Sequence, residues 1–246
     1  MNRITGFYMS FKGKTSTEMG AFPTSLPKIQ TAVVGDEMKN IAGRMGFITV
    51  RNNSYKAVKI KQEIAVPNES VKDAVLAWLS GDGELFFSTD TAKAWDACVL
   101  TAYEQTPLFS RLDGIKFTVT FDCHPFRHAR NESQIVLRTG NVFNGLGTEN
   151  ADPLLKLEGS GTGVLIVNGH TVTVQLTSNK PLYLDCETGD AFTDDNGLLT
   201  PAGNCVVLTD SWPYLLPQAA DASGYNNVSF TGGISKVTIT PRWRWY

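Results

Sequence analysis

Hydrophobic and polar residues alternate along most of this chain, the pattern of antiparallel strands with one face on a core and the other in water. In GIKFTVTFD, residues 114–122, one face would carry Ile115, Phe117, Val119 and Phe121. Residues 55–66, YKAVKIKQEIAV, alternate in the same way, and residues 95–103, WDACVLTAY, are rich in residues that favour strands. The pattern predicts a mainly β protein.

One segment, residues 70–79, has helical spacing instead. Its apolar positions fall at i, i+3, i+4, i+7 and i+8, the stripe of a helix with one buried face: Val71, Ala74, Val75, Trp78 and Leu79. Ser70 stands where an N-cap belongs, with Asp73 three residues later as in a capping box. Gly81 and Gly83 supply a stop. We therefore expect a short helix packed on a sheet.

The second half of the chain consists of short apolar runs separated by Gly, Asn and Asp turns, which favours a compact β-sandwich. Within it, Asn168-Gly169 lies between two β-branched runs and predicts a hairpin with a type I′ turn. The character changes near residue 126, around RHARNESQ (127–134), which is short and polar. We predict an N-terminal antiparallel β domain with one helix at residues 1–130 and a β-sandwich domain at 131–246. The last strand, KVTITPRWRWY, has the alternative of returning to the N-terminal domain.

Composition narrows the classes of function. The 246 residues carry a net charge of −2 with both signs mixed, so no basic stripe suggests sequence-specific nucleic-acid binding. No apolar run approaches the ~20 residues that span a bilayer. The N-terminus lacks the apolar core of a signal peptide, so we expect synthesis in a cytoplasm and no membrane partner. Four cysteines lie far apart and are expected to be buried, reduced, small apolar residues.

The stretch FDCHPFRH, residues 121–128, raises the question of a metal site or a nucleophile with its base. Cys123 and His124 are neighbours and would face opposite sides of a strand, so one cation cannot easily take both. Cys123 continues the apolar face of the preceding strand, and His128 follows in an expected turn. The simplest interpretation is a strand end, with Cys123 buried, His124 outside and Pro125 terminating the ladder.

Other candidate sites are weak. Residues 185–197, DCETGDAFTDDNG, lack the ligand order of a calcium loop and are better explained as a hairpin with an acidic tip. No phosphate-binding or serine-hydrolase motif occurs, and no carboxylate pair is nominated for glycoside hydrolysis. In ITPRWRWY, Trp243 and Trp245 are expected to be packed, with Arg242 and Arg244 outside. We predict no catalytic, cofactor-binding or metal-binding residue, no cofactor and no enzymatic activity.

Several motifs, taken in order, resemble those of siphophage distal tail proteins. In the first half they are IAGRMG (41–46), AWLSGDGELFFSTD (77–90) and FTVTFDCHPF (117–126). In the second half they are NGLGTENADPLLKLEGSGTGVLIVNG (144–169), YLDCETGDAF (183–192), SWPYLLP (211–217) and NNVSFTGGISKVTITPRWR (226–244). The segment AADASGYN (219–226) departs from the family pattern. The resemblance covers almost the whole chain and makes FDCHPFRH a structural boundary.

This resemblance implies a virion protein that forms a homohexameric ring at the distal end of a long non-contractile tail. The ring would join the tail tube protein to the tail-tip hub protein and the host-adsorption apparatus, with a receptor-binding protein as a further partner. N-terminal domains would form the ring, galectin-like C-terminal domains would project, and DNA would pass through without being read. Two alternatives stay open: a carbohydrate-binding module, and a β-sandwich glycoside hydrolase.

Overall fold

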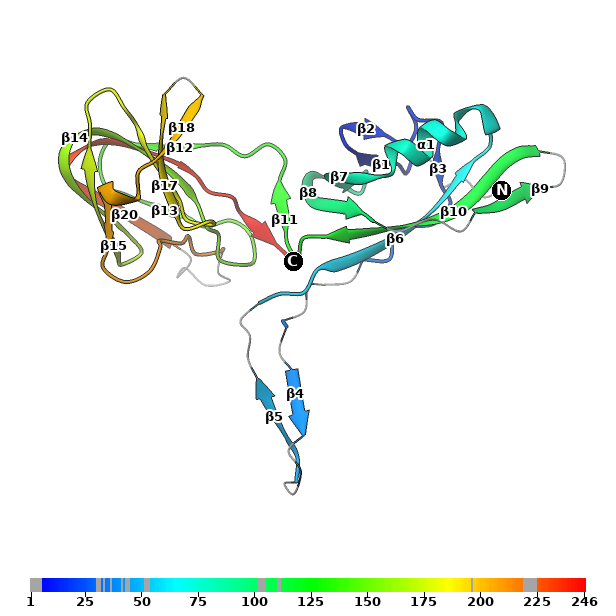
Figure 1. The fold of residues 1–246 in the computed structure, drawn as a ribbon, viewed down its shortest axis with the longest axis horizontal. Coiled ribbons are helices and arrows are strands. Elements are labelled where there is room, and N and C mark those ends of the chain that lie inside the picture. The colour runs from blue at the N-terminus through cyan, green and yellow to red at the C-terminus, as the bar shows by residue number, and fades with distance from the viewer. Residues whose placement is uncertain are drawn as a thin grey trace. The chain divides into compact units, whose positions relative to one another are not determined.

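The protein, seen here in a computed structural model, is mainly β with one short α-helix among the residues described (Figure 1). These residues are 6–29, 32, 34–35, 37–40, 42, 45–50, 54–100, 105–109, 112–195, 197–218 and 225–246. The chain divides into two compact units, residues 1–130 with Tyr246 and residues 131–245. Each unit has its own apolar core. No helix in the described part is long and apolar enough to cross a membrane.

An antiparallel sheet forms the first unit, with strand order β2-β1-β7-β8-β10-β6-β3. The strands are β1 (Met9–Phe11), β2 (Lys14–Thr15), β3 (Phe22–Pro23), β6 (Val58–Val66), β7 (Gly81–Phe87), β8 (Asp90–Val99) and β10 (Leu112–Cys123). Beside β10 lies β9 (Gln105–Phe109), and beside β8 lies β11 (Arg127–Ala129). A separate two-stranded sheet consists of β4 (Glu37–Asn40) and β5 (Phe47–Val50).

The predicted apolar face of residues 114–122 is confirmed. β10 pairs with β6 from Ile115↔Val66 to Cys123↔Val58, and the inward side chains of both strands are buried in the first core. One polar residue, Gln62, shares this face and is fully buried. Its Nε2 donates to the Ser25 carbonyl at 2.7 Å, which holds the segment after β3 against the sheet.

The predicted helix is present as α1 (Lys72–Trp78), preceded by a 3-10 turn, η1 (Glu69–Val71). Its Trp78 indole Nε1 donates to the Phe11 carbonyl at 2.7 Å, which attaches the helix to β1. The prediction that Ser70 caps the helix is wrong. The Ser70 amide and hydroxyl both donate to Asn68 Oδ1, at 3.0 and 2.8 Å, and the N-cap residue is Val71. The chain begins to turn earlier than the capping pattern indicated, so Asn68 takes the role assigned to Ser70.

Three further predictions in the first unit, on the glycines after the helix, the strand at 95–103 and the IAGRMG motif, are met only in part. Gly81, the first residue of β7, has φ +71°, as a stop requires, whereas Gly83 lies further along the same strand. The strand expected at residues 95–103 begins earlier, at Asp90, and ends at Val99; residues 101–103 lie outside the described residues. Half of the IAGRMG motif, residues 41, 43 and 44, also lies outside them.

The second unit is a β-sandwich built around two long strands, β14 (Leu154–Val167) and β20 (Tyr225–Thr240), in the sheet order β12-β20-β14-β16-β17-β18. The others are β12 (Ile135–Leu137), β16 (Leu182–Asp185), β17 (Asp190–Asp195) and β18 (Leu198–Pro201). Off this path, β13 (Asn141–Asn144) pairs with β20, β15 (His170–Leu176) with β14, and β19 (Val206–Leu208) with β15. A 3-10 turn, η2 (Gly203–Cys205), precedes β19.

A few positions in this unit require glycine or asparagine, because φ is positive there or because two backbones approach closely. Asn168 and Gly169 have φ of 50° and 91°, which confirms the two positive-φ residues expected for the β14–β15 turn. The pairing of β14 with β20 shifts register near Gly159. A Cβ at Gly159 would lie 1.9 Å from the Gly233 carbonyl oxygen, so the two backbones can approach this closely only with glycine.

Candidate interaction site

The segment FDCHPFRH ends one strand and begins another. Cys123 is 1% exposed at the end of β10, and burial together with the charge of Asp122 raises the pKa of its thiol to about 12. The prediction of a buried Cys123 is confirmed, and such a thiol is a poor nucleophile. His124 is exposed, as expected. His128 lies in β11, paired with Ala94 of β8, and not in a turn, so part of the expected linker is a strand.

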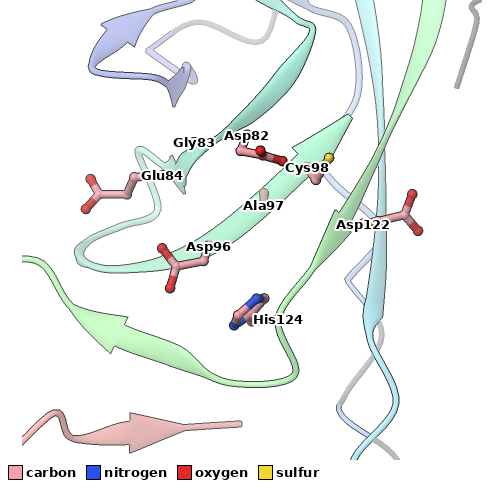
Figure 2. A pocket seen from close by; sticks show the side chains of 8 residues that line it. All are labelled: Asp82, Gly83, Glu84, Asp96, Ala97, Cys98, Asp122 and His124. Atoms are coloured by element: carbon pink, nitrogen blue, oxygen red, sulfur yellow. The ribbon is translucent and has the colours of Figure 1, made fainter. Parts of the chain in front are cut away.

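Four carboxylates from three strands gather on the face of this sheet that carries the polar side chains (Figure 2). On β7 and β8, Glu84 lies directly opposite Asp96. One step along, Cys98 of β8 lies opposite both Asp82 of β7 and Asp122 of β10. Like charges directly opposite each other destabilise a sheet, so this arrangement has a cost within the unit itself.

Basic side chains offset part of that cost. Arg130 Nε lies 2.7 Å from Glu84 Oε1, and His128 lies 3.5 Å from a carboxylate oxygen of both Glu84 and Asp96. The Arg130 guanidinium also lies 3.6 Å from the centre of the Phe86 ring. Since Arg130 and His128 come from the segment after β10, this segment brings basic side chains onto the acidic face formed by Asp82, Glu84, Asp96 and Asp122.

Between these carboxylates lies a hollow of about 350 Å³, lined also by Ala97, Cys98 and His124. Figure 2 shows the Asp82 carboxylate pointing toward Cys98. A hydrogen bond to Asp82 is the main cause that raises the pKa of the Cys98 thiol, followed by burial and by the negative charge of Asp82 and Asp122. The thiol is therefore not activated for attack. The chemistry that the hollow offers is attraction for basic groups. Within the described residues, no three His, Cys, Asp or Glu side chains are grouped as a metal site; the absence of a metal stays a prediction.

In the second unit, a serine, a histidine and an aspartate meet, which the sequence did not indicate. His170 Nδ1 lies 3.0 Å from Asp210 Oδ2 and 3.2 Å from Ser211 Oγ, and its ring lies 4.9 Å from that of Tyr214. A catalytic triad requires the acid and the nucleophile on different ring nitrogens. Here both contact Nδ1, so the arrangement fixes the start of β15 against the 209–214 segment and does not form a triad.

Acidic side chains at the end of β16 and after it form ion pairs with two arginines near the C-terminus. Arg242 binds Asp185 through two hydrogen bonds of 2.6 and 3.0 Å, and Arg244 binds Asp152 at 2.6 Å. Glu187 contacts both arginines, at 3.2 and 2.9 Å. Arg242 and Arg244, expected to lie outside, are half-buried because they form these ion pairs. Trp243, by contrast, is buried as predicted. Residues 185–197, expected as one acidic hairpin, instead cover the end of β16, the turn to β17 and β17 itself, which pairs with β18.

No family model matches the chain, and no curated protein matches it by sequence. Among solved structures, it is similar to the SPP1 Dit protein, described as a paradigm of hub adsorption apparatus in phages that infect Gram-positive bacteria. The identity is 14% and the TM-score 0.69, over 96% of this chain and 98% of that one. The chain has the Dit fold. It is also similar to a chain of the phage P2 baseplate in its activated conformation with Ca, at 9% identity and a TM-score of 0.52 over the whole of both chains.

The likeness to Dit spans both units, so the order of a helix-bearing β unit and a β-sandwich unit is common to the two chains. The fold expected from the resemblance to distal tail proteins is therefore confirmed. At these identities the comparison concerns the fold, and sites must be argued from the residues of this chain.

Proposed function

We propose that the protein is a structural component of a phage tail tip that forms a homohexameric ring between the tail tube and the tail-tip hub protein. The observation that carries this proposal is the similarity to Dit over nearly the full length of both chains. On this proposal the protein resides in the virion, acts without catalysis and supports host adsorption, with a receptor-binding protein as a further partner.

The two units would divide the work. We assign ring formation to residues 1–130 and an outward-projecting role to residues 131–246. The first unit carries the acidic face, whose opposed carboxylates are costly within one chain and would gain from basic groups of a neighbour. A head-to-tail ring brings different surfaces of adjacent subunits together, so complementary charge is a suitable device for it.

The test is the assembly state of the full chain, alone and co-expressed with the tail-tip hub protein of the same phage. We expect particles about six times the mass of the 26.9 kDa chain, visible as rings by electron microscopy. A monomer alone is compatible with assembly that needs the hub. A stable dimer or trimer that never forms rings, even with the hub, would overturn the proposal.

Paired variants then test the acidic face. Asp96→Lys removes one of the opposed carboxylates and should lower the yield of rings or of the hub complex. The matched control is Asp73→Lys, which makes the same change at an exposed position in the first turn of α1. If both variants assemble equally well, the acidic face is not one of the ring contacts. The proposal of a ring would then be tested by the mass measurement alone.

A further inference from the structure

The edge strand β18 of the second unit has unusual exposure. All four of its residues, Leu198 to Pro201, are exposed, with Leu198 at 70% and Leu199 at 60%. β18 ends the sheet and has β17 as its partner in the described part of the chain (Figure 1). Edge strands are normally protected by charged residues or proline, since their free backbone groups recruit other strands. Here two consecutive leucines occupy the edge, and Pro201 is its one protective residue.

The register shows which backbone groups are free. The Ala202 amide donates to the Ala191 carbonyl at 2.8 Å, so the backbone N–H at this position points toward β17. Alternation along the antiparallel ladder then turns the backbone groups of Leu199 and Pro201 away from β17. Proline at 201 fits this, since it has no N–H to offer the ladder. The free edge therefore presents the Leu199 N–H, the Leu199 carbonyl and the Pro201 carbonyl.

A cavity of about 350 Å³ lies beside this edge. Its lining includes Gly189, Asp190, Pro201 and Trp212. A Cβ at Gly189 would lie 3.2 Å from the Trp212 indole nitrogen, so glycine lets the ring lie close to the turn before β17. An aromatic ring and the exposed carboxylate of Asp190 in one cavity suit the side chain of an arginine or lysine.

Charge decides which occupant fits. Residues 190–201 contain three aspartates and neither lysine nor arginine. A second copy of this chain that paired through the same edge would bring its own aspartates against these. We propose that β18 binds an extended segment of another protein, which adds as a strand along Leu199 to Pro201 and places an arginine or lysine in the cavity of Asp190 and Trp212. This mode combines backbone hydrogen bonds with a side-chain pocket, and it does not depend on the ring proposed above.

The experiment is a titration of the full-length, ¹⁵N-labelled chain with a blocked peptide of sequence Thr-Val-Thr-Arg-Val-Thr, followed by NMR. We expect saturable shifts at the Leu199 amide and the Trp212 indole. A peptide with Glu in place of Arg should bind about tenfold more weakly, because the charged pair with Asp190 becomes a repulsion. If neither peptide binds saturably, or if both bind equally, the proposal is wrong.

Two variants test separately the backbone edge of β18 and the side-chain cavity. Leu199→Pro removes an N–H that points away from β17, so it should abolish peptide binding without removing a ladder bond of the protein. Asp190→Asn should weaken the Arg peptide about tenfold. Its control is Asp195→Asn, an exposed aspartate on the same hairpin that pairs with Lys180 and does not line the cavity.

Melting temperatures of all three variants show whether the unit stays folded. If Leu199→Pro does not fold, Asp190→Asn still tests the proposal. Equal losses of affinity for the Arg peptide in Asp190→Asn and Asp195→Asn would refute the proposed pocket. Unchanged binding by a folded Leu199→Pro variant would refute the edge. Leu199 shifts that depend on protein concentration without peptide would make a second copy the occupant and contradict our choice of partner.

Discussion

Replacing Asn226 should destabilise the second unit more than any surface change in β20. Its side chain is fully buried. Asn226 Oδ1 accepts from the Leu216 amide at 2.7 Å and from Asn168 Nδ2 at 2.8 Å, while its Nδ2 donates to the Leu216 carbonyl at 3.1 Å. The amide thus connects the segment before residue 218 to the turn of the β14–β15 hairpin.

In Asn226→Ala all three hydrogen bonds are lost and their partners remain half-buried. At about 1 kcal/mol for each bond, the free energy of unfolding should fall by about 3 kcal/mol. For a unit of this size that corresponds to a melting temperature lower by roughly 10 °C. Calorimetry and urea unfolding followed by tryptophan fluorescence measure both quantities. The control is Asn227→Ala at the next, exposed position, expected to change stability by about 0.5 kcal/mol or less.

Asn226→Asp makes the test sharper. The ionised carboxylate keeps one acceptor but sets its second oxygen against the Leu216 carbonyl, whereas the protonated acid can donate to it. Burial and this repulsion should raise the pKa of the new Asp, so the variant should approach the wild type at acidic pH and lose stability as pH rises through that pKa. A loss below about 1 kcal/mol in Asn226→Ala, or an Asp variant as stable as the wild type at pH 7, would refute the reasoning.

Three further predictions concern thiols, backbone and charge. At pH 8 a thiol reagent should leave Cys123 and Cys186 unlabelled until the chain unfolds, since burial raises the pKa of both to about 12; rapid native labelling would contradict this. Because these pKa values are raised, the thiols should also cost stability as pH rises above about 9. In Gly233→Ala, a Cβ 2.2 Å from a β14 carbonyl oxygen should cost about 2 kcal/mol or more by denaturant unfolding, and an unchanged midpoint would argue against the close approach. Arg242 lowers the pKa of Asp185, so Arg242→Met should remove stability that is present at neutral pH and fades as pH falls below about 4; a stability difference that persists unchanged at pH 2 would count against it.

Local patterns predicted most of the strands because alternation is a property of neighbouring residues. The β6 and β10 faces and the Asn168-Gly169 turn followed from a few consecutive positions each. The helix start did not, because Asn68 and Ser70 are both plausible caps and only the backbone path decides between them. The ion pairs of Arg242 and Arg244 were not predicted, because Asp185 and Asp152 lie 57 and 92 positions away from them in the sequence.

The candidate sites could not be predicted in the same way, because they depend on register between distant strands. Glu84 and Asp96 are unremarkable in sequence until β7 and β8 place them opposite each other. The same is true of His170 with Asp210, which lie 40 positions apart in the chain and 3.0 Å apart in space. A single sequence carries no signal for such pairs unless the pairing of the strands is already known.

An identity of 14% with Dit alongside a shared fold also has a physical basis. Core positions accept any apolar residue of suitable volume, so alternation survives while identities change. Positions with backbone demands, such as Gly159 against Gly233, have far fewer substitutes. Surface positions are constrained by neither requirement. The acidic face of β7, β8 and β10 and the apolar edge of β18 are therefore not explained by the fold, and this is why we propose a contact with another molecule for each of them.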